Sequence, residues 1–242
     1  MADESSPVKV SVILPCFNEK ENILFLIESI HSYLKEHTHE IVVVDDNSPD
    51  GTYDLVANSN LPFVKVFKRT SDPSLAKSIR YGIEKSIGDF LIVMDSDFNH
   101  KPEYLPIMVD NLKYYDFISA SRFVYGGDMR NRFRHICSWL FNIFTRILTR
   151  TFVTDSLFGY FAVKREILSL VNFDKVFWGY GDYCIRLMYY LQKKRVSILQ
   201  IPGVLGERLG GEGNTRMIKT LMQYTVEVIK LVFLTNGKNE NK

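Results

Sequence analysis

Two aspartates one residue apart, Asp95 and Asp97, directly follow the apolar run 90–94. Such a run is typical of a buried strand, and burying two adjacent carboxylates costs on the order of several kcal/mol unless a cation or hydrogen-bond donors compensate them. Mg²⁺ and Mn²⁺ prefer oxygen ligands and keep positions open for phosphate. The pair therefore indicates a metal site for a diphosphate, although a strand that ends in a solvated turn has the same pattern.

Polar residues also follow two earlier strand candidates. Asp45 and Asp46 come directly after the run 40–44, where they could accept hydrogen bonds from a base or a ribose, and Asn18 and Glu19 follow the first strand after a turn that starts at Pro15. In the structural alternative, Ser48 or Asp50 caps the next helix and the two aspartates are merely solvated. The functional interpretation places all three strand ends in one cleft.

The elements that must position these residues follow from hydrophobic periodicity. Short β-branched runs alternate with helix-like segments, which predicts an α/β fold with a mostly parallel sheet flanked by helices. The predicted strands are 9–14, 40–44, 64–68, 90–94 and 117–120, and the predicted helices between them are 22–36, 52–59, 75–86 and 103–114. In an open sheet of this kind ligands bind at the carboxyl ends of the strands.

Size and charge restrict the class of protein. The 242 residues predict one domain over residues 1–235, with disordered tails at 1–7 and 236–242. A formal net charge of +2 is too small to indicate a nucleic-acid partner. Three scattered cysteines argue against a disulfide framework and a structural zinc site, which fits a reducing cytoplasm. We expect no signal peptide and no membrane span.

The second half contains two amphipathic helix candidates. Apolar residues recur at helical spacing over 133–148, with Arg132, Arg134, Arg146 and Arg150 on or near the opposite side. Such a helix either covers a flank of the sheet or lies in a membrane interface. A second candidate, 217–234, is apolar around most of its circumference, so we expect it to be buried, docked on a membrane or covered by a partner.

The motifs at the strand ends resemble those of a known family. Val12-Ile-Leu-Pro-Cys-Phe-Asn-Glu, Val43-Val-Asp-Asp-Asn-Ser-Pro-Asp-Gly-Thr and Met94-Asp-Ser-Asp-Phe-Asn-His-Lys-Pro-Glu are similar, in this order, to motifs of the family 2 glycosyltransferases, which have the Rossmann-like GT-A fold. Within that family the chain most resembles the dolichyl- or polyprenyl-phosphate mannosyltransferase and glucosyltransferase group. The resemblance extends from Val8 to Leu234.

The resemblance implies a site for a nucleotide-diphosphate sugar, GDP-mannose or UDP-glucose being the candidates. The residues that match the family's donor-binding positions are Pro15, Phe17, Glu19, Val44, Asp46, Arg69, Asp95, Ser96 and Asp97. Asp95, Asp97 and Asn99 match the metal site, for Mg²⁺ or Mn²⁺. Asp45 is a possible substitute for Asp46, and a lone histidine such as His100 is more often structural.

On the acceptor side the resemblance implies a polyprenyl phosphate held by arginines, which bind phosphate in a bidentate manner. Arg122, Arg134 and Arg208 match these positions, and we expect Asp97, Asp155, Arg122 and Arg134 to be the catalytic group. The family's Arg-x-x-Gly-Glu-Ser-Lys-Thr motif is altered here, with Gly213 and Asn214 in place of serine and lysine, so Arg216 or Lys219 would have to supply the missing cation.

The function implied is inverting transfer of a hexose to polyprenyl or dolichyl phosphate at the cytosolic face of a membrane, either on the membrane surface or against a membrane-embedded partner subunit. The alternative is a sugar-hydroxyl acceptor, for which Asp182 would be the base, although this residue could equally cap a helix. A catalytically inactive relative or a nucleotidyltransferase is less consistent with the sequence, because Asp95 and Asp97 are intact and no glycine-rich phosphate loop opens the first helix.

Overall fold

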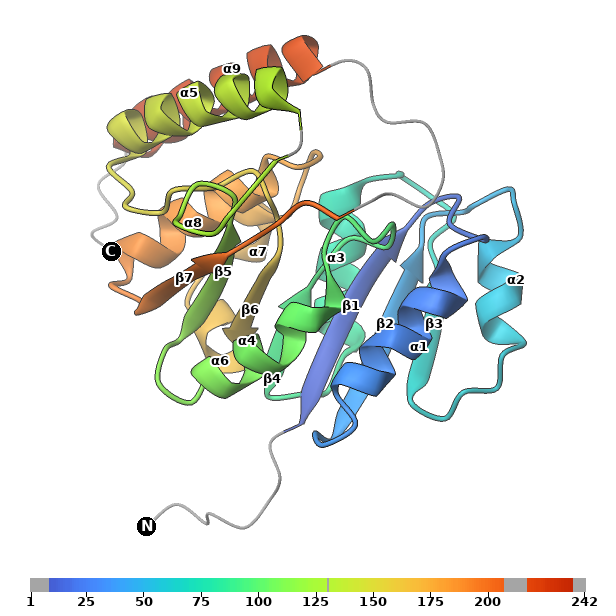
Figure 1. Cartoon of the computed structure of the whole chain (residues 1–242). Coiled ribbons are helices and arrows are strands. Elements are labelled where there is room, and N and C mark those ends of the chain that lie inside the picture. The colour runs from blue at the N-terminus through green and yellow to red at the C-terminus, as the bar shows by residue number, and fades with distance from the viewer. Residues whose placement is uncertain (1–8, 130, 207–216, 237–242) are drawn as a thin grey trace.

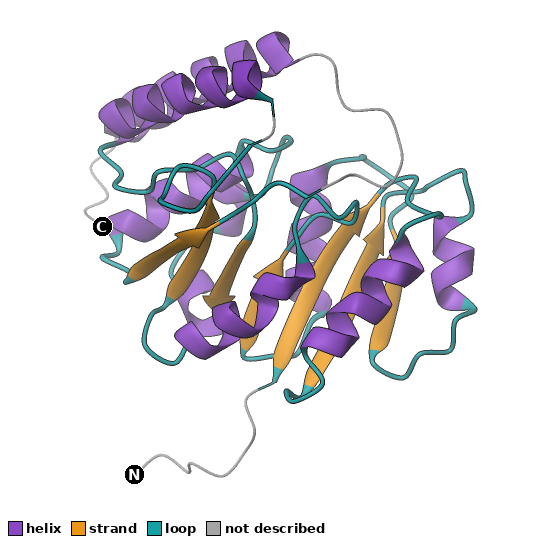
Figure 2. Cartoon of the chain, in the orientation of Figure 1, coloured by secondary structure: helices purple, strands orange, loops and turns teal. Residues whose placement is uncertain are grey.

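A computed structural model describes residues 9–129, 131–206 and 217–236. Within these ranges seven strands form one sheet, in the order β3-β2-β1-β4-β6-β5-β7. All neighbouring strands are parallel except for β6, which runs antiparallel to both β4 and β5. The mostly parallel α/β sheet that the sequence predicts is confirmed (Figures 1 and 2).

Strands and helices alternate along the first half of the chain. The strands are β1 (Val10–Cys16), β2 (His39–Asp45), β3 (Val64–Lys68), β4 (Phe90–Val93), β5 (Phe117–Ser121), β6 (Phe161–Lys164) and β7 (Ile198–Pro202). The helices are α1 (Ile23–Tyr33), α2 (Thr52–Ala57), α3 (Leu75–Lys85), the 3-10 turn η1 (Pro102–Tyr104), α4 (Leu105–Asn111), α5 (Arg132–Thr149), α6 (Arg165–Leu168), α7 (Phe173–Val176), α8 (Tyr183–Lys193) and α9 (Met217–Asn236).

Two apolar layers cover the sheet. On one face α1, α2 and α4 pack with residues such as Leu26 and Met108 against β1, β2 and β4. On the other face α3, α6, α7 and α8 pack with residues such as Ile79 and Leu187 against the same sheet. Burial of both faces keeps the sheet rigid, so the loops at its carboxyl edge are held on a fixed frame.

The prediction that the first strand ends at residue 14, with a turn at Pro15, was wrong. Pro15 lies inside β1, in register with Val44, and the strand continues to Cys16. Proline fits there because β4 ends at Val93, opposite Ile13. The nitrogen of Pro15 therefore faces the side on which no strand partner remains to accept a hydrogen bond.

Several other elements differ from the sequence prediction. The helix expected over 103–114 is a 3-10 turn followed by α4, because Pro106 in the first turn sets a new helix start. The helix expected over 22–36 ends at Tyr33, where the Leu34 amide donates to the Ile30 carbonyl. Sequence periodicity missed β6, β7 and the helices α6 to α8. Each of these elements has only four or five residues, except for α8, which is longer.

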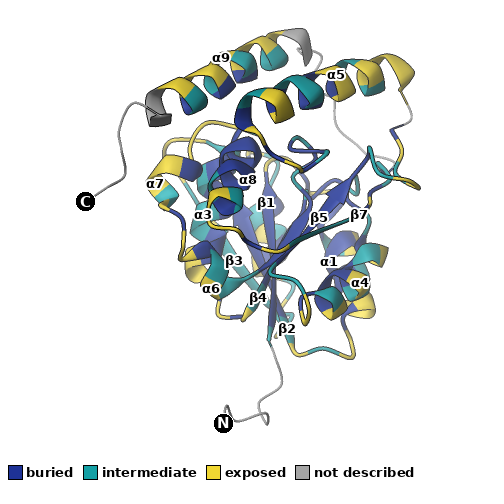
Figure 3. Ribbon diagram, turned by 90° about the vertical axis from the view of Figure 1, so that its left-hand side faces the viewer, coloured by how far each residue is buried: buried dark blue, intermediate teal, exposed yellow. Residues whose placement is uncertain are grey.

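The two amphipathic helices expected in the second half lie side by side (Figures 1 and 3). Together with α8 they form a small separate core that includes Phe141, Tyr189, Tyr224 and Val228. None of the helices in the described part of the chain is both long enough and apolar enough to cross a bilayer.

Gly82 on α3 lies so close to the sheet that it has no space for a side chain. A Cβ at this position would lie 2.5 Å from Ile13 Cγ2 and 3.2 Å from Val44 Cγ2. We predict that Gly82→Ala lowers the free energy of unfolding by about 1–2 kcal/mol, because overpacking outweighs the gain in helix propensity. Urea denaturation measures this, and exposed Lys85→Ala, on the same helix, should change stability by less than about 0.5 kcal/mol. A stabilised Gly82→Ala variant would contradict the close packing.

Candidate active site

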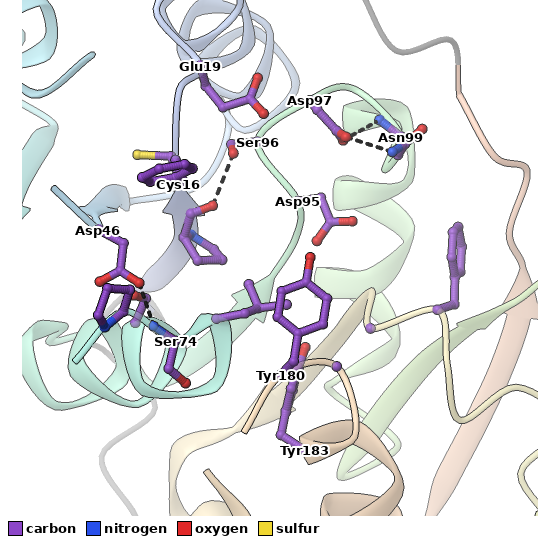
Figure 4. A pocket seen from close by; sticks show the side chains of 18 of the residues that line it. Cys16, Glu19, Asp46, Ser74, Asp95, Ser96, Asp97, Asn99, Tyr180 and Tyr183 are labelled. Atoms are coloured by element: carbon purple, nitrogen blue, oxygen red, sulfur yellow. Dashed lines mark hydrogen bonds between the residues drawn. The ribbon is translucent and has the colours of Figure 1, made fainter. Parts of the chain in front are cut away.

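A pocket of about 590 Å³ lies where β1, β2 and β4 end (Figure 4). Its wall contains nearly every strand-end residue that the sequence singled out, namely Pro15, Phe17, Glu19, Asp46, Asp95, Ser96, Asp97 and Asn99. The opposite wall comes from segments far away in the sequence, among them Ser74, Tyr180 and Tyr183. The predicted convergence of three strand ends on one cleft is confirmed.

Hydrogen bonds between loops fix the wall that follows β1. The Asn18 amide donates to Ser48 Oγ at 2.9 Å, and the Glu19 amide donates to Thr52 Oγ1 at 3.0 Å. Both acceptors lie in the loop and first helical turn that follow β2. The loop carrying Phe17, whose side chain is 55% exposed in the pocket, is therefore attached to its neighbour rather than left mobile.

The aspartates that follow β2 have separate environments. Asp45 is fully buried and accepts a hydrogen bond from the Ser48 amide at 2.9 Å, so it holds the turn. Asp46 lines the pocket and accepts hydrogen bonds from the Ser74 amide at 2.6 Å and Arg69 Nη1 at 2.8 Å. Burial raises the pKa of Asp46, and the Ser74 amide and Arg69 oppose that rise. Asp46 is thus the member of the pair that can meet a ligand.

Two other predicted donor-site residues lie behind this wall. Val44 is fully buried, and its side chain faces Gly82 of α3. Neither Val44 nor Arg69 belongs to the pocket wall. Arg69 also donates to Ser78 Oγ at 2.6 Å and to the Ser74 carbonyl at 3.3 Å. The structure therefore places Arg69 as the residue that orients Asp46 and fixes the start of α3.

The turn after β4 points its carboxylates into the pocket. The Asp95 side chain is 44% exposed, and Asp97 accepts hydrogen bonds from the Asn99 amide at 3.1 Å and from Asn99 Nδ2 at 2.7 Å (Figure 4). Ser96 Oγ donates to the Pro15 carbonyl at 3.0 Å, which attaches this turn to the end of β1. Asn99, predicted as a metal ligand, contacts Asp97 directly.

His100 forms a hydrogen bond with this turn and helps to fix its position. Its Nδ1 accepts from the Asp95 amide at 2.8 Å, so its Nε2, 2.9 Å from the Phe158 carbonyl, carries the proton. Its ring stacks on Tyr160 with 4.7 Å between centroids. Complete burial lowers the pKa of His100 to about 4, so the ring is neutral at neutral pH. The expectation of a structural histidine agrees with this environment.

The donor atoms at the turn suit a hard divalent cation. Asp95 and Asp97 offer carboxylate oxygens, and no cluster of three or more His, Cys, Asp or Glu side chains able to hold a metal occurs among the described residues. Mg²⁺ sites that contain substrate phosphates commonly use only one or two carboxylates, with phosphate and water completing the shell. The pair therefore fits an ion that arrives with a diphosphate, and does not fit a preformed structural metal site.

Arg122 and Asp155, two predicted catalytic residues, form a buried ion pair. Arg122 Nε and Nη2 donate to the two carboxylate oxygens of Asp155 at 2.7 and 2.9 Å, and the Arg122 amide adds a third bond at 3.1 Å. The guanidinium lies 4.9 Å from the ring centroid of Phe158, which lines the pocket. The pair therefore lies one side chain behind the pocket wall.

Asp182, considered as a general base, is not in the wall of this pocket. It precedes α8, and its carboxylate accepts from the Tyr180 amide at 2.9 Å and pairs with Arg186. Arg186 in turn contacts the Trp178 ring, 3.7 Å from its centroid. Asp182 occupies the N-terminal cap position of α8 without making a side-chain cap bond to the helix, so its contacts hold the preceding turn.

The remaining acceptor-side arginines have different positions. Arg134 lies exposed in the first turn of α5, where its amide donates to the Asn131 side chain at 2.9 Å. Arg208 and Arg216 lie outside the described residues, as do the predicted disordered tails apart from Asn236.

Sequence reasoning missed part of the pocket wall. Ser74, Tyr180 and Tyr183 are not among the predicted site residues, although all three line the pocket. Ser74 Oγ donates to the Gly179 carbonyl at 2.6 Å, so it joins the Asp46 side of the pocket to the turn that carries Tyr180. In Figure 4 the Tyr180 hydroxyl points toward Asp95. The serine before an apolar helical run was the available signal, since it caps α3.

A mostly parallel sheet with polar residues gathered in a pocket at its carboxyl edge is typical of Rossmann-like α/β domains, which bind their ligands there. The sequence profile of Glycosyl transferase family 2 matches residues 11–170. The chain therefore belongs to glycosyl transferase family 2.

Two relatives are named for their lipid acceptors. The chain is 30% identical over 231 residues to a dolichol-phosphate mannosyltransferase from Pyrococcus furiosus, covering 93% of this chain and 64% of that protein. The chain thus spans slightly less than two thirds of the length of this relative. It is also 30% identical over 214 residues to an undecaprenyl-phosphate mannosyltransferase from Micrococcus luteus, covering 85% of this chain and 86% of that protein.

Solved structures share the fold at lower identity. Glucosyl-3-phosphoglycerate synthase from Mycobacterium tuberculosis, crystallised with Mn²⁺ and UDP-glucose, superposes with a TM-score of 0.69 at 20% identity, covering 92% of this chain and 78% of that one. Another structure of the same synthase contains Mg²⁺ and UDP. These likenesses support the fold.

Removing Arg122 should reveal how strongly Asp155 depends on it. We predict that Arg122→Met lowers the free energy of unfolding by about 3–5 kcal/mol, because it leaves a buried carboxylate without its partner. Arg122→Met combined with Asp155→Leu should recover most of that loss in urea denaturation. Lys113→Ala breaks an exposed pair with Asp110 and should cost less than about 1 kcal/mol. An Arg122→Met variant as stable as the wild type would contradict the buried pair.

Proposed function

We propose that this chain transfers a hexose, mannose or glucose, from a nucleotide-diphosphate sugar to polyprenyl or dolichyl phosphate with inversion of the anomeric centre. Support for the acceptor comes from the relatives that are named dolichol-phosphate and undecaprenyl-phosphate mannosyltransferases. GDP-mannose and UDP-glucose are the candidate donors.

The observation that carries this proposal is the charge of the pocket. Glu19, Asp46, Asp95 and Asp97 line it, and the described part of its wall contains no lysine or arginine. A diphosphate cannot enter such a site without a cation to offset the carboxylates. Mg²⁺ or Mn²⁺ held by Asp95 and Asp97, with Asn99 beside them, meets that requirement and would stabilise the departing diphosphate.

The donor's nucleoside belongs at the Asp46 end of this pocket. Phe17 and Pro15 offer apolar surface to a base, while the Asp46 carboxylate, oriented by Arg69 and the Ser74 amide, can accept hydrogen bonds from its edge. Glu19 lies on the same wall and is positioned to accept from a ribose. Asp46 and Asp95 thus divide the pocket into a nucleoside end and a diphosphate end.

The environment of Asp182 favours a phosphate acceptor over a sugar hydroxyl. A sugar hydroxyl needs a general base within hydrogen-bond reach, but Asp182 lies outside the pocket wall and is paired with Arg186. A phosphate is already anionic and needs no base. The reaction then consists of holding a phosphate oxygen in line with the anomeric carbon while the bond to the diphosphate breaks.

We propose Arg134, Arg208 and Arg216 as the ligands of the lipid phosphate, of which only Arg134 lies among the described residues. The Nε and Nη2 atoms of Arg122 already donate to Asp155. We therefore assign Arg122 and Asp155 to shaping the acceptor side of the pocket through Phe158, and the direct phosphate contacts to the other arginines.

The test is turnover of GDP- and UDP-sugars with polyprenyl phosphate in detergent, with and without Mn²⁺. We expect Asp97→Ala to reduce kcat by at least about 100-fold, because it removes a metal ligand at the developing charge. The Asp182→Asn variant should retain most of the activity, whereas it would lose the activity if Asp182 were the general base. Transfer to a sugar hydroxyl that depends on Asp182, with none to lipid phosphate, would support the alternative acceptor.

The orientation of α5 supports docking on a lipid surface. Its buried residues are mainly polar, namely Ser138, Asn142, Thr145 and Thr149 with Phe141, while several of its large apolar residues are exposed. Phe133, Ile136, Leu140 and Ile147 are 54–71% exposed. On α9, Met222, Val226, Ile229 and Phe233 form a second exposed stripe at helical spacing. Figure 3 shows exposed positions, in yellow, along both helices.

We propose that these two stripes enter the interface of the cytosolic leaflet. Arg132 and Arg146 on α5, and Arg150 directly after it, are exposed and can meet anionic headgroups. This arrangement would bring a polyprenyl phosphate to the active site without a membrane-spanning helix.

Membrane docking predicts a clear mutational effect. Leu140→Glu with Ile147→Glu should weaken binding to vesicles of phosphatidylcholine and phosphatidylserine by at least about tenfold, because charges enter the interface poorly. Vesicle co-sedimentation measures this. Tyr114→Glu is the control, because Tyr114 is 79% exposed and precedes β5 at the amino edge of the sheet, away from α5 and α9. Wild-type chain that fails to bind vesicles would contradict lipid docking and favour a membrane-embedded partner subunit.

A further inference from the structure

A bulky residue has a left-handed backbone conformation inside the metal-binding turn. Phe98, between Asp97 and Asn99, has φ of 62°, a region that residues with a Cβ enter only when their surroundings enforce it. With this conformation, both the amide and the side chain of Asn99 donate to the Asp97 carboxylate. A contact from outside the turn is therefore needed to maintain the orientation of Asp97.

Gly206, just beyond β7, supplies such a contact. Its amide donates to the Asn99 carbonyl at 2.9 Å. A Cβ on Gly206 would lie 1.9 Å from the Phe98 carbonyl oxygen and 3.1 Å from the carbonyl carbon. The φ of Gly206 is outside the left-handed region, so alanine is excluded here by lack of space alone.

The segment that carries Gly206 cannot move away to make room. On its other side it is bonded to the loop after β5. The Gly203 amide donates to the Ser121 carbonyl at 2.8 Å, the Asp128 amide to the Gly203 carbonyl at 3.1 Å, and the Leu205 amide to the Asp128 carbonyl at 3.2 Å. Any side chain at position 206 must therefore displace the turn 97–99 or break this backbone ladder.

We propose that Gly206 is a positioning residue for the metal-binding carboxylates. Its close approach keeps Phe98 and Asn99 in the conformation that orients Asp97, although Gly206 itself lies outside the pocket wall. The inference rests on the proposed metal site at Asp95 and Asp97. It adds a residue that the acidic motif does not contain and that lies more than a hundred positions later in the sequence.

Mn²⁺ binding tests the proposal without turnover. Free Mn²⁺ is measured by electron paramagnetic resonance during titration of each variant, with GDP and with UDP present. We expect Gly206→Ala to weaken Mn²⁺ binding by about 10- to 100-fold, the range found when residues that support metal ligands are changed. Gly88→Ala is the matched control, because its Cβ would lie 2.7 Å from the Lys9 carbonyl oxygen at the opposite edge of the sheet. It should lower Tm without changing Mn²⁺ affinity.

A folded Gly206→Ala variant with wild-type Mn²⁺ affinity overturns the inference alone. If Asp97→Ala also binds Mn²⁺ as the wild type does, the proposed metal site itself is wrong, and the inference is overturned with it. Should Gly206→Ala fail to fold, amide exchange of the wild type decides. We expect Mn²⁺ with nucleoside diphosphate to slow exchange of the Gly206 amide, and an unchanged rate overturns the proposal.

Discussion

Carboxylates gathered at one edge of the sheet impose the constraint on which this structure depends. Each buried carboxylate must be compensated within a low-dielectric environment. Arginines compensate three of them, in the pairs Asp46 with Arg69, Asp155 with Arg122 and Asp182 with Arg186. These pairs surround the pocket and leave its centre acidic. The divalent cation proposed at Asp95 and Asp97 would add positive charge at this acidic centre.

The sequence was sufficient to predict one half of the pocket wall, because that half is built from the ends of parallel strands. A parallel sheet brings such ends to one edge whatever the details of packing, so Glu19, Asp46 and Asp95 could be grouped before any coordinates. The other half depends on distant segments. Ser74 and Tyr180 meet through a bond to the Gly179 carbonyl, and no local pattern encodes a contact between residues so far apart. The pairing of Arg122 with Asp155 was hidden for the same reason.

Periodicity identified α5 but could not tell which side faces inward. The helical spacing of apolar residues shows which side of a helix is apolar and which is polar. The usual inference is that the apolar side is buried. Here Asn142 Oδ1 accepts hydrogen bonds from the amide and hydroxyl of Ser156, so the polar stripe has a specific partner inside the protein at this residue. Those bonds, made to a residue beyond the helix, decide the orientation that hydrophobicity alone left open.

The antiparallel strand β6 has a consequence for the order in which the sheet forms during synthesis. One edge of β4 pairs with β1. The other edge of β4 pairs with β6, so it has no partner until Phe161 has left the ribosome. The strand β5 joins the sheet only through β6 and β7. At about 5–20 residues per second, the segment from Val93 to Phe161 takes on the order of 3 to 14 s to synthesise. For that time the nascent chain presents an open apolar strand edge, so chaperone engagement should be concentrated between these two points of elongation.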